Sequence, residues 1–250
     1  MNQTKIQAHR GAAAYLPENT LEAFDLAICQ GADMIELDVH LTKDNQVVVA
    51  HDERIDRVSN GKGFIKDYTL SELKKFNFNK EHPEAIDFCQ IPTLAEVYEL
   101  IAPTNLGINC ELKTTQLFYP GLTEKVVKLA KEYDLTDRLL YSSFNHYSLL
   151  ELRAFAPEAK IGLLYELGMV DPWVYANYVK ATAIHPQFFI IASLPETVQK
   201  CHEAGIEVNV WVPDDIENIN KMLVAGVDGI ITNKPDLALA AREDFLNAQS

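Results

Sequence analysis

The feature that most constrains the fold is a regular alternation of short strand-like runs with longer amphipathic runs along the 250-residue chain. The first kind is rich in apolar and β-branched residues, and the second places apolar residues at helical spacing. Strands are expected at residues 6–8, 34–39, 107–112, 139–142, 161–164, 183–185, 207–212 and 229–232. Helices are expected at residues 21–30, 94–101, 122–132, 147–155, 173–179, 195–204, 216–225 and 237–247. Eight such units predict one α/β domain over residues 1–250, a (β/α)8 TIM barrel.

Residues that start and stop helices stand where this pattern needs them. Glycine adopts the left-handed backbone conformation that ends many helices, and threonine or aspartate side chains accept hydrogen bonds from the first backbone amides. The expected helix boundaries are marked by Gly31, Gly205, Gly226, Thr20, Thr93 and Asp215. A doubly wound open sheet is the alternative fold, but no G-x-G-x-x-G or G-x-x-x-x-G-K-S/T phosphate loop follows any expected strand.

One interval between the expected elements is too long for a simple connection. The residues between His51 and Ile91 are largely polar and include the turn sequence Ser-Asn-Gly-Lys-Gly at 59–63. Loops of this length usually have structure of their own. We therefore expect a small insertion at about residues 52–91, between strand 2 and helix 2. It would project from the carboxyl-terminal rim of the barrel, where TIM-barrel active sites lie, and form part of a substrate wall.

The charge balance limits the partners of the protein. The chain has 22 basic and 36 acidic residues, a net charge of −14, and 48% of its residues are apolar. Such a surface repels phosphate backbones and anionic lipids, so neither nucleic acid nor a stable membrane association is expected. It is also unfavourable for an anionic small-molecule substrate, unless a bound cation reverses the local potential. The sequence does not indicate an oligomeric state.

The cysteines and the amino terminus favour a reduced, cytoplasmic protein. The four cysteines are far apart and form no C-x-x-C pair, so we expect buried thiols rather than disulfides or a metal site. They are Cys29, Cys89, Cys110 and Cys201. No apolar signal core precedes the first strand, and no run of ~20 apolar residues is long enough for a membrane span.

Three carboxylates are expected to converge near the carboxyl-terminal mouth of the barrel. Strand side chains alternate between faces, so Glu36 and Asp38 point inward while their apolar neighbours face the helices. The same alternation directs Glu111 inward on the next strand, together with Asn109 and Lys113. A divalent cation, Mg²⁺ or Ca²⁺, relieves the repulsion between crowded carboxylates better than protonation of one of them. The alternative is that Glu36 and Asp38 are solvated on an edge strand, which a closed barrel lacks.

Two histidines follow expected strand ends and are candidate acid/base residues. His9 comes directly after the first strand, and His51 follows a short apolar run in the second connection. Histidine titrates near neutrality, so two of them on opposite sides of a phosphorus atom can act as general base and general acid. A lone histidine is more often structural, but two beside a carboxylate cluster favour catalysis. The H-x-H pair typical of zinc amidohydrolase barrels is absent from strand 1.

Two cations and one tryptophan complete the candidate site. Arg10 and Lys113 lie nearest the carboxylates, and a guanidinium can bind two phosphate oxygens at once. Lys113 can also serve as a counter-ion for the carboxylates, and the two roles are compatible. Trp211 is expected on the inward face near the end of strand 7. It would either form an apolar wall for the substrate or fill the barrel.

These residues belong to an ordered set of short motifs, each of them weak alone. The motifs are His-Arg-Gly at 9–11, Pro-Glu-Asn-Thr at 17–20, Glu-Leu-Asp-Val at 36–39, His-Asp at 51–52, Ile-Pro-Thr-Leu at 91–94, Glu-Leu-Lys at 111–113, Val-Asn-Val-Trp at 208–211, Gly-Val-Asp-Gly at 226–229 and Thr-Asn-Lys-Pro at 232–235. In order and spacing the set resembles the glycerophosphodiester phosphodiesterase family. The resemblance covers about residues 7–237.

The resemblance implies a TIM-barrel enzyme that uses a divalent metal to hydrolyse glycerophosphodiesters to sn-glycerol 3-phosphate and an alcohol. The residues it assigns are the metal ligands Glu36, Asp38 and Glu111, the acid/base pair His9 and His51, the phosphate-binding Arg10 and Lys113, and the pocket aromatic Trp211. In the 17–20 motif, we expect Asn19 and Thr20 to fix the loop and cap the first long helix, with Glu18 orienting a neighbour.

Alternatives remain open at the level of the sequence. The chain departs from the family pattern at Val58 and at residues 212–215, which lie in expected wall segments, so the preferred alcohol is open. A phosphodiesterase of the same barrel acting on a lysophospholipid or a cyclic phosphodiester is one alternative. A metal-dependent protein that binds phosphodiesters without hydrolysing them is another. We favour His9 as base and His51 as acid, although the sequence alone does not assign these roles.

Overall fold

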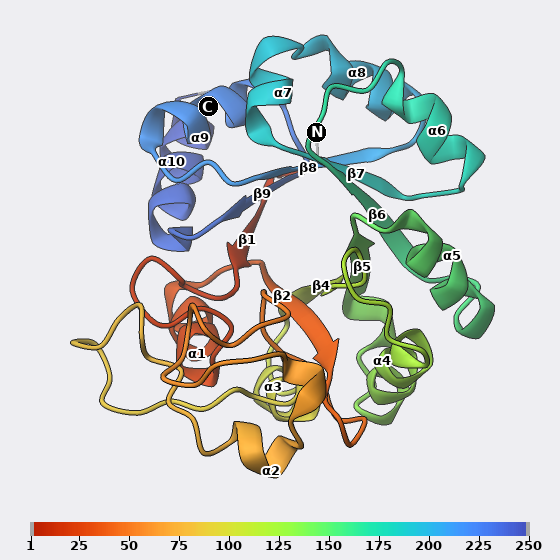
Figure 1. Ribbon diagram of the computed structural model, residues 1–250. Helices are drawn as coiled ribbons and strands as arrows, with labels where there is room; N and C mark the ends of the chain where they lie inside the picture. Colours follow the sequence, from red (N-terminus) through yellow and green to blue (C-terminus); the bar gives the residue numbers. More distant parts are fainter. Residues whose placement is uncertain (1–2, 249–250) are drawn as a thin grey trace.

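The computed structural model describes residues 3–248, which form a closed barrel of parallel strands surrounded by helices (Figure 1). The barrel strands are β1 (Lys5–His9), β2 (Met34–Leu41), β4 (Gly107–Leu112), β5 (Leu139–Ser143), β6 (Lys160–Tyr165), β7 (Ala183–Pro186), β8 (Glu207–Trp211) and β9 (Gly229–Thr232). Each is parallel to its neighbours, and β1 pairs with both β2 and β9, which closes the sheet. The predicted TIM barrel is therefore confirmed.

Helices connect the strands on the outside of the barrel. They are α1 (Leu21–Gln30), α3 (Leu94–Ile101), α4 (Leu122–Glu132), α5 (His146–Phe155), α6 (Pro172–Tyr178), α7 (Phe188–Ser193), α8 (Glu196–Glu203), α9 (Ile216–Ala225) and α10 (Pro235–Asn247). The expected caps are confirmed at α1, where Thr20 accepts from the amide of Ala23 and Gly31 takes a left-handed φ of 82°. Helix α7 was not predicted, because its aromatic and β-branched residues lack a polar face.

The strand alternation predicted from the sequence separates two environments. On β2, Ile35, Leu37 and Val39 are buried in the apolar layer between the barrel and its helices. Glu36 and Asp38 alternate with them and are buried on the inner side. Pairing of β2 with β4 places Asp38 opposite Glu111, so the register itself brings carboxylates of two strands together.

The barrel interior contains a chain of buried polar side chains. Ser142 donates a hydrogen bond to Asn109 (2.8 Å), and Asn109 donates to Gln7 (3.1 Å). Gln7 donates to Asn209 (3.2 Å), and Asn209 donates to His185 Nε2 (3.0 Å). Burial lowers the pKa of His185 to about 3, so the ring is neutral at physiological pH and can accept that bond. The network links five strands across the barrel.

The segment between β2 and α3 has a small core of its own. Strand β3 (Val47–Val49) runs antiparallel to β2, and the chain then forms a 3₁₀ turn (Ile65–Asp67) and the short helix α2 (Leu70–Leu73). Buried apolar residues gather there around Phe78, with Tyr68 and Phe76 packed against them. The segment lies beside α1 and α3, in orange and yellow at the bottom of Figure 1.

The cysteine prediction is correct for three of the four residues. Cys89, Cys110 and Cys201 are buried, and none of the four is in a disulfide. The prediction is wrong for Cys29, which is exposed, because α1 packs on the barrel through Ala23, Phe24 and Ala27 and turns Cys29 outward. Among residues 3–248, no helix combines the length and apolar character that crossing a membrane requires.

Candidate active site

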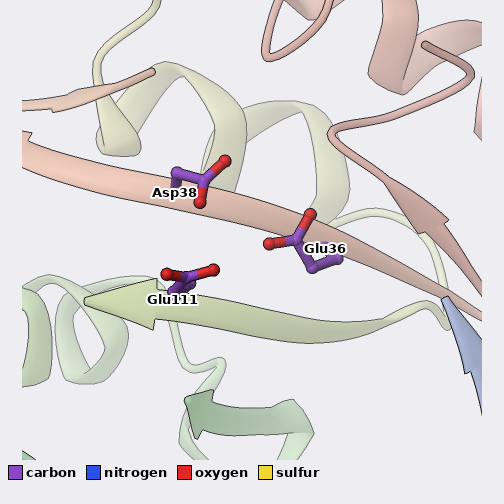
Figure 2. Close-up of side chains that lie close together, drawn as sticks. All are labelled: Glu36, Asp38 and Glu111. Carbon is purple, nitrogen blue, oxygen red and sulfur yellow. The ribbon is translucent and has the colours of Figure 1, made fainter. Parts of the chain in front are cut away.

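Three carboxylates meet at the carboxyl-terminal end of the barrel, as the sequence predicted. Glu36 and Asp38 come from β2 and Glu111 from β4, and one oxygen of each lies within 4.8 Å of the others (Figure 2). All three side chains are buried; Asp38 has no exposed surface at all. Such a set of oxygens matches the ligands that a hard divalent cation prefers.

Burial and mutual repulsion oppose ionisation of these carboxylates, and a bound cation would stabilise their ionised forms. Burial, with the charges of Asp38 and Glu111, raises the pKa of Glu36 well above its ordinary value. Burial and the charge of Asp38 also raise the pKa of Glu111, although Lys113 opposes that shift. Burial alone would raise the pKa of Asp38 too, but the neighbouring side chains, with Lys113 first and Arg10 also contributing, hold it well below its usual range. Because the buried Oδ1 of Asp38 has no hydrogen-bond partner, the cluster has a ligand atom to offer a metal ion.

Two residues of the loop after β1 orient the carboxylates. Arg10 has a positive φ of 55°, and its backbone amide donates to Glu36 Oε2 at 2.9 Å. Asn19, also with a positive φ of 56°, is buried and donates from its side chain to Asp38 Oδ2 at 2.9 Å. Asn19 therefore supports a candidate ligand in addition to fixing its loop.

His9 is the last residue of β1 and lies opposite Glu36 in the strand pairing. Its Nδ1 bonds to the side-chain oxygen of Asn233 at 2.8 Å, and the Asn233 amide group donates to Asp214 at 2.6 Å. Since an amide oxygen only accepts, His9 carries its hydrogen on Nδ1 and leaves Nε2 as the basic nitrogen. Burial and the charge of Arg10 lower the pKa of His9 to about 3. The ring is therefore neutral in the absence of bound ligands.

His51 follows β3 and is held by a different kind of partner. Its Nδ1 is 2.6 Å from Asp52 Oδ1, so a carboxylate rather than an amide orients this ring. Its backbone carbonyl accepts from Nε2 of the fully buried His40 at 3.1 Å. His40 Nδ1 in turn accepts from the hydroxyl of Tyr119 at 3.0 Å. His40 was not singled out in the sequence, because it occupies one more inward position on β2 with no motif of its own.

The predicted cations and the tryptophan lie around the same point. Lys113 Nζ donates to Glu111 Oε1 at 2.9 Å and lies 3.7 Å from Asp38 Oδ1, so it acts as a counter-ion in this structure. Arg10 donates from Nη1 to Glu18 at 3.0 Å. Trp211 donates to the carbonyl of His185 at 2.8 Å and meets Phe144 edge-on, with ring centroids 5.5 Å apart.

Two hollows flank the His9–Arg10 pair. A narrow one of about 50 Å³ is lined by both histidines, Glu36, Glu111 and Trp211. An open one of about 330 Å³ is lined by Glu18, Glu81, His82, Asp214 and Asn233 as well as His9 and Arg10. His9 and Arg10 thus lie between a narrow hollow with mixed polar and apolar walls and an open hollow with acidic walls. All eight site residues chosen from the sequence lie in this one region.

A larger hollow of about 440 Å³ occupies the opposite end of the barrel. It is lined by residues that begin the strands, including Lys5, Met34, Gly107 and Lys160. None of the candidate acid/base residues or carboxylate ligands contributes to it. The candidate acid/base residues therefore lie at the narrower hollow, at the carboxyl-terminal end.

Comparisons with known proteins identify the family of this chain. Residues 9–237 match the model of the glycerophosphoryl diester phosphodiesterase family. A glycerophosphodiester phosphodiesterase of Caldanaerobacter subterraneus subsp. tengcongensis is 47% identical over 234 residues, which cover 94% of this chain and 96% of that protein. A phosphodiesterase of Oleispira antarctica, solved in complex with the product sn-glycerol-3-phosphate, is 28% identical with a TM-score of 0.85, over 96% of this chain and 97% of that one. A Silicibacter pomeroyi structure, 22% identical with a TM-score of 0.88 over 97% and 94% of the two chains, shares the fold.

Proposed function

The chain belongs to the glycerophosphoryl diester phosphodiesterase family, and from that premise we propose that it hydrolyses glycerophosphodiesters to sn-glycerol 3-phosphate and an alcohol. The observation that carries the proposal is that three buried carboxylates meet beside a recess lined by two of them and by both histidines. The product bound by the Oleispira antarctica relative supports the same substrate class.

Glu36, Asp38 and Glu111 would hold the divalent cation, Mg²⁺ or Ca²⁺. When bound, the ion supplies positive charge for the phosphate oxygens and helps to orient the substrate. The unpartnered Asp38 Oδ1 and the mutual repulsion of the three carboxylates support this role. A cation there also explains how a chain with a net charge of −14 binds an anionic phosphodiester.

The surroundings of the two histidines support His9 as general base and His51 as general acid. His9 is buried, paired with a neutral amide and close to Arg10, so its ring stays neutral and able to take a proton from the nucleophile. His51 is oriented through Nδ1 by the carboxylate of Asp52 rather than by a neutral amide, and we assign the proton-donor role to this second ring. As the bond from phosphorus to the leaving oxygen breaks, His51 would protonate that alkoxide. The nucleophile is either water or the neighbouring glycerol hydroxyl. In the second case a cyclic phosphate would form, and water would then open it to give sn-glycerol 3-phosphate.

The remaining predicted residues would bind the substrate. Arg10 lies between the two hollows and can donate to phosphate oxygens. Lys113 would share its charge between the carboxylates and the phosphate. Trp211, fixed by its bond to the His185 carbonyl, would pack against the glycerol moiety in the narrow recess. The alcohol would then extend into the open hollow.

A lysophospholipid substrate is less well supported. Such a substrate needs an apolar surface for its acyl chain, and the aromatic residues of the 52–91 segment were the candidates. Phe78 is buried in the core of that segment, and Phe76 and Tyr68 pack against it. These three side chains are therefore used in internal packing, which leaves Phe88, 50% exposed, and the partly buried Phe64 as the aromatic surface of the segment.

The proposal is tested with metal-depleted protein assayed on glycerophosphocholine, glycerophosphoethanolamine and glycerophosphoglycerol, with Mg²⁺ and Ca²⁺ added back separately. We expect turnover only after addition of an ion. Release from a lysophospholipid in place of these substrates would favour the alternative, and binding without turnover would favour a non-catalytic protein.

The acid/base assignment has its own test. Replacing either His9 or His51 with alanine should lower kcat by at least ~10², the usual contribution of a positioned proton-transfer group. Steady-state kinetics on the best of the three substrates measures this. Turnover near the wild-type rate in both variants would refute the assignment.

A further inference from the structure

The 52–91 segment contributes an arginine, Arg57, that contacts none of the three clustered carboxylates. We propose that Arg57 is a positioning residue with two contacts. It orients the carboxylate of Asp52, which in turn orients the His51 ring, and it fixes the loop that carries His51 relative to the loop that follows His9. The inference rests on the proposed function, because it assigns Arg57 a role only if His51 takes part in the reaction.

Arg57 is linked to His51 through Asp52. Arg57 Nε donates to Asp52 Oδ2 at 2.8 Å, and its Nη2 donates to Oδ1 at 3.2 Å. Both oxygens of Asp52 are thereby fixed by one planar group, and a bidentate pair restricts rotation of the carboxylate. Asp52 Oδ1 accepts from His51 Nδ1 at 2.6 Å, so the plane of the carboxylate determines the direction of the ring. The bonds to His51 and Arg57 also hold the pKa of Asp52 well below its ordinary value.

Arg57 also contacts the loop after β1, through Glu18. Arg57 Nη2 and Nη1 donate to the two oxygens of Glu18 at 2.7 and 3.0 Å. Glu18 also accepts from Arg10 Nη1 at 3.0 Å, and Arg10 directly follows His9. One guanidinium group therefore joins the loop that carries His51 to the loop that follows His9. Lysine cannot reproduce this arrangement, because its ammonium group has no planar fork for two carboxylates.

The exposure of the pairs separates a positioning role from a structural one. The Arg57 and Asp52 side chains are 38% and 29% exposed. Glu18 is only 11% exposed, but it keeps its bond from Arg10 when Arg57 is replaced. Ion pairs with this degree of solvent contact contribute little to the stability of a fold. A purely structural role for Arg57 therefore predicts small effects of its replacement on kcat, KM and stability. A positioning role predicts a loss of kcat without a comparable loss of stability or of substrate binding.

The decisive experiment is a double-mutant cycle between Arg57 and His51. The variants are Arg57→Met, Arg57→Lys, His51→Ala and Arg57→Met combined with His51→Ala, assayed on glycerophosphocholine with saturating metal. The matched control is Arg54→Met in the same segment, because Arg54 pairs with Asp56 at 2.9 Å and packs over Phe64, away from His51.

We expect Arg57→Met to lower kcat by about 10- to 100-fold, with KM changed by less than about threefold. Arg57→Lys should keep a kcat at least about fivefold below wild type, since it retains the charge but loses the planar fork. The double variant should be within about twofold of His51→Ala, because a residue that acts through His51 has nothing left to position. Arg54→Met should keep wild-type kcat, and all single variants should melt within about 3 °C of wild type.

The unfavourable outcomes are distinct. Losses that multiply in the double variant, or full activity in Arg57→Met or Arg57→Lys, would overturn the inference and leave the proposed function intact. Near wild-type turnover in His51→Ala would remove the role of His51 itself, and the inference would fall with it.

Discussion

At the scale of single residues, side chains with the same functional group acquire different properties from their neighbours. Glu36 and Asp38 are two positions apart on β2, yet the pKa of Glu36 is raised by burial and by adjacent carboxylates, and that of Asp38 is lowered by Lys113, His51 and Arg10. Glu36 is therefore the member of the cluster that most needs a cation to stay ionised. The same logic separates His9, bonded to an amide, from His51, bonded to a carboxylate.

Glu36→Gln should maintain or raise the stability of the metal-depleted protein, but reduce the stabilisation that added metal provides. Because folding raises the pKa of Glu36, its contribution to stability is complete below its unfolded pKa and is lost as pH rises through the folded pKa. Metal-depleted Glu36→Gln should therefore be at least as stable as wild type at pH 7.5. Metal at about 100 times its Kd should stabilise wild type by about 2.7 kcal/mol, and the variant much less.

Thermal unfolding with EDTA and with added Mg²⁺ or Ca²⁺ measures both effects. Glu217→Gln is the control, because Glu217 is 78% exposed on α9 and pairs only with Lys221 in the described structure. A metal-depleted Glu36→Gln protein that melts well below wild type would contradict this account of the cluster.

Residues that support the site were harder to predict than residues that form it. Glu36, Asp38 and Glu111 follow from strand alternation, which is a local rule. Asn233 does not, since it meets His9 across 224 positions of sequence only when the barrel closes. Arg57 likewise reaches Glu18 across 39 positions, from a stretch of the 52–91 segment that lies outside any helix or strand. Contacts of this kind depend on tertiary geometry, for which the sequence contains no periodic signal.

At the scale of elements, the barrel depends on glycines that make room for its polar interior. A Cβ atom at Gly229 on β9 would lie 2.1 Å from Asn209 Oδ1 and 2.6 Å from Gln7 Nε2. Those two groups belong to the hydrogen-bonded chain that crosses the barrel. The strands themselves were predictable from apolar runs, whereas this interior was not, because TIM-barrel interiors are more often filled by branched apolar residues.

We expect Gly229→Ala to destabilise the protein by about 1–3 kcal/mol, the usual range for overpacking a closed interior. Gly168→Ala is the matched control, since a Cβ there meets nothing within 4 Å, and its effect should stay within about 0.5 kcal/mol. Calorimetric unfolding of the two variants gives the comparison. Equal stability of the two would show that the interior chain yields without cost.

At the scale of the whole molecule, the charge of the chain acts on the choice of substrate. The net charge is −14, and the open hollow beside His9 is lined by Glu18, Glu81 and Asp214. Two positive charges oppose these three carboxylates: Arg10 lines the hollow, and Arg57 pairs with Glu18 and Glu81. An alcohol that carries a positive charge gains there, while a neutral alcohol leaves the substrate with its full negative charge.

The expected result is a kcat/KM for glycerophosphocholine and glycerophosphoethanolamine about threefold above that for glycerophosphoglycerol at low ionic strength. Raising the salt concentration to 0.5 M should bring the values together, because exposed charges are then screened over about 4–5 Å. A preference that survives high salt would point to shape rather than charge. A preference for glycerophosphoglycerol at low salt would refute the argument.

The closure of the barrel by its two ends has a consequence for biosynthesis. Strand β1 pairs with β9, and His9 takes its orienting bond from Asn233, which comes just after β9. A growing chain therefore leaves one edge of its first strand unpaired until β9 has been translated. Throughout that interval the carboxylates of β2 and β4 have already been made, but His9 lacks the partner that fixes its ring in the folded protein, so the candidate site can assemble only after Asn233 has been translated.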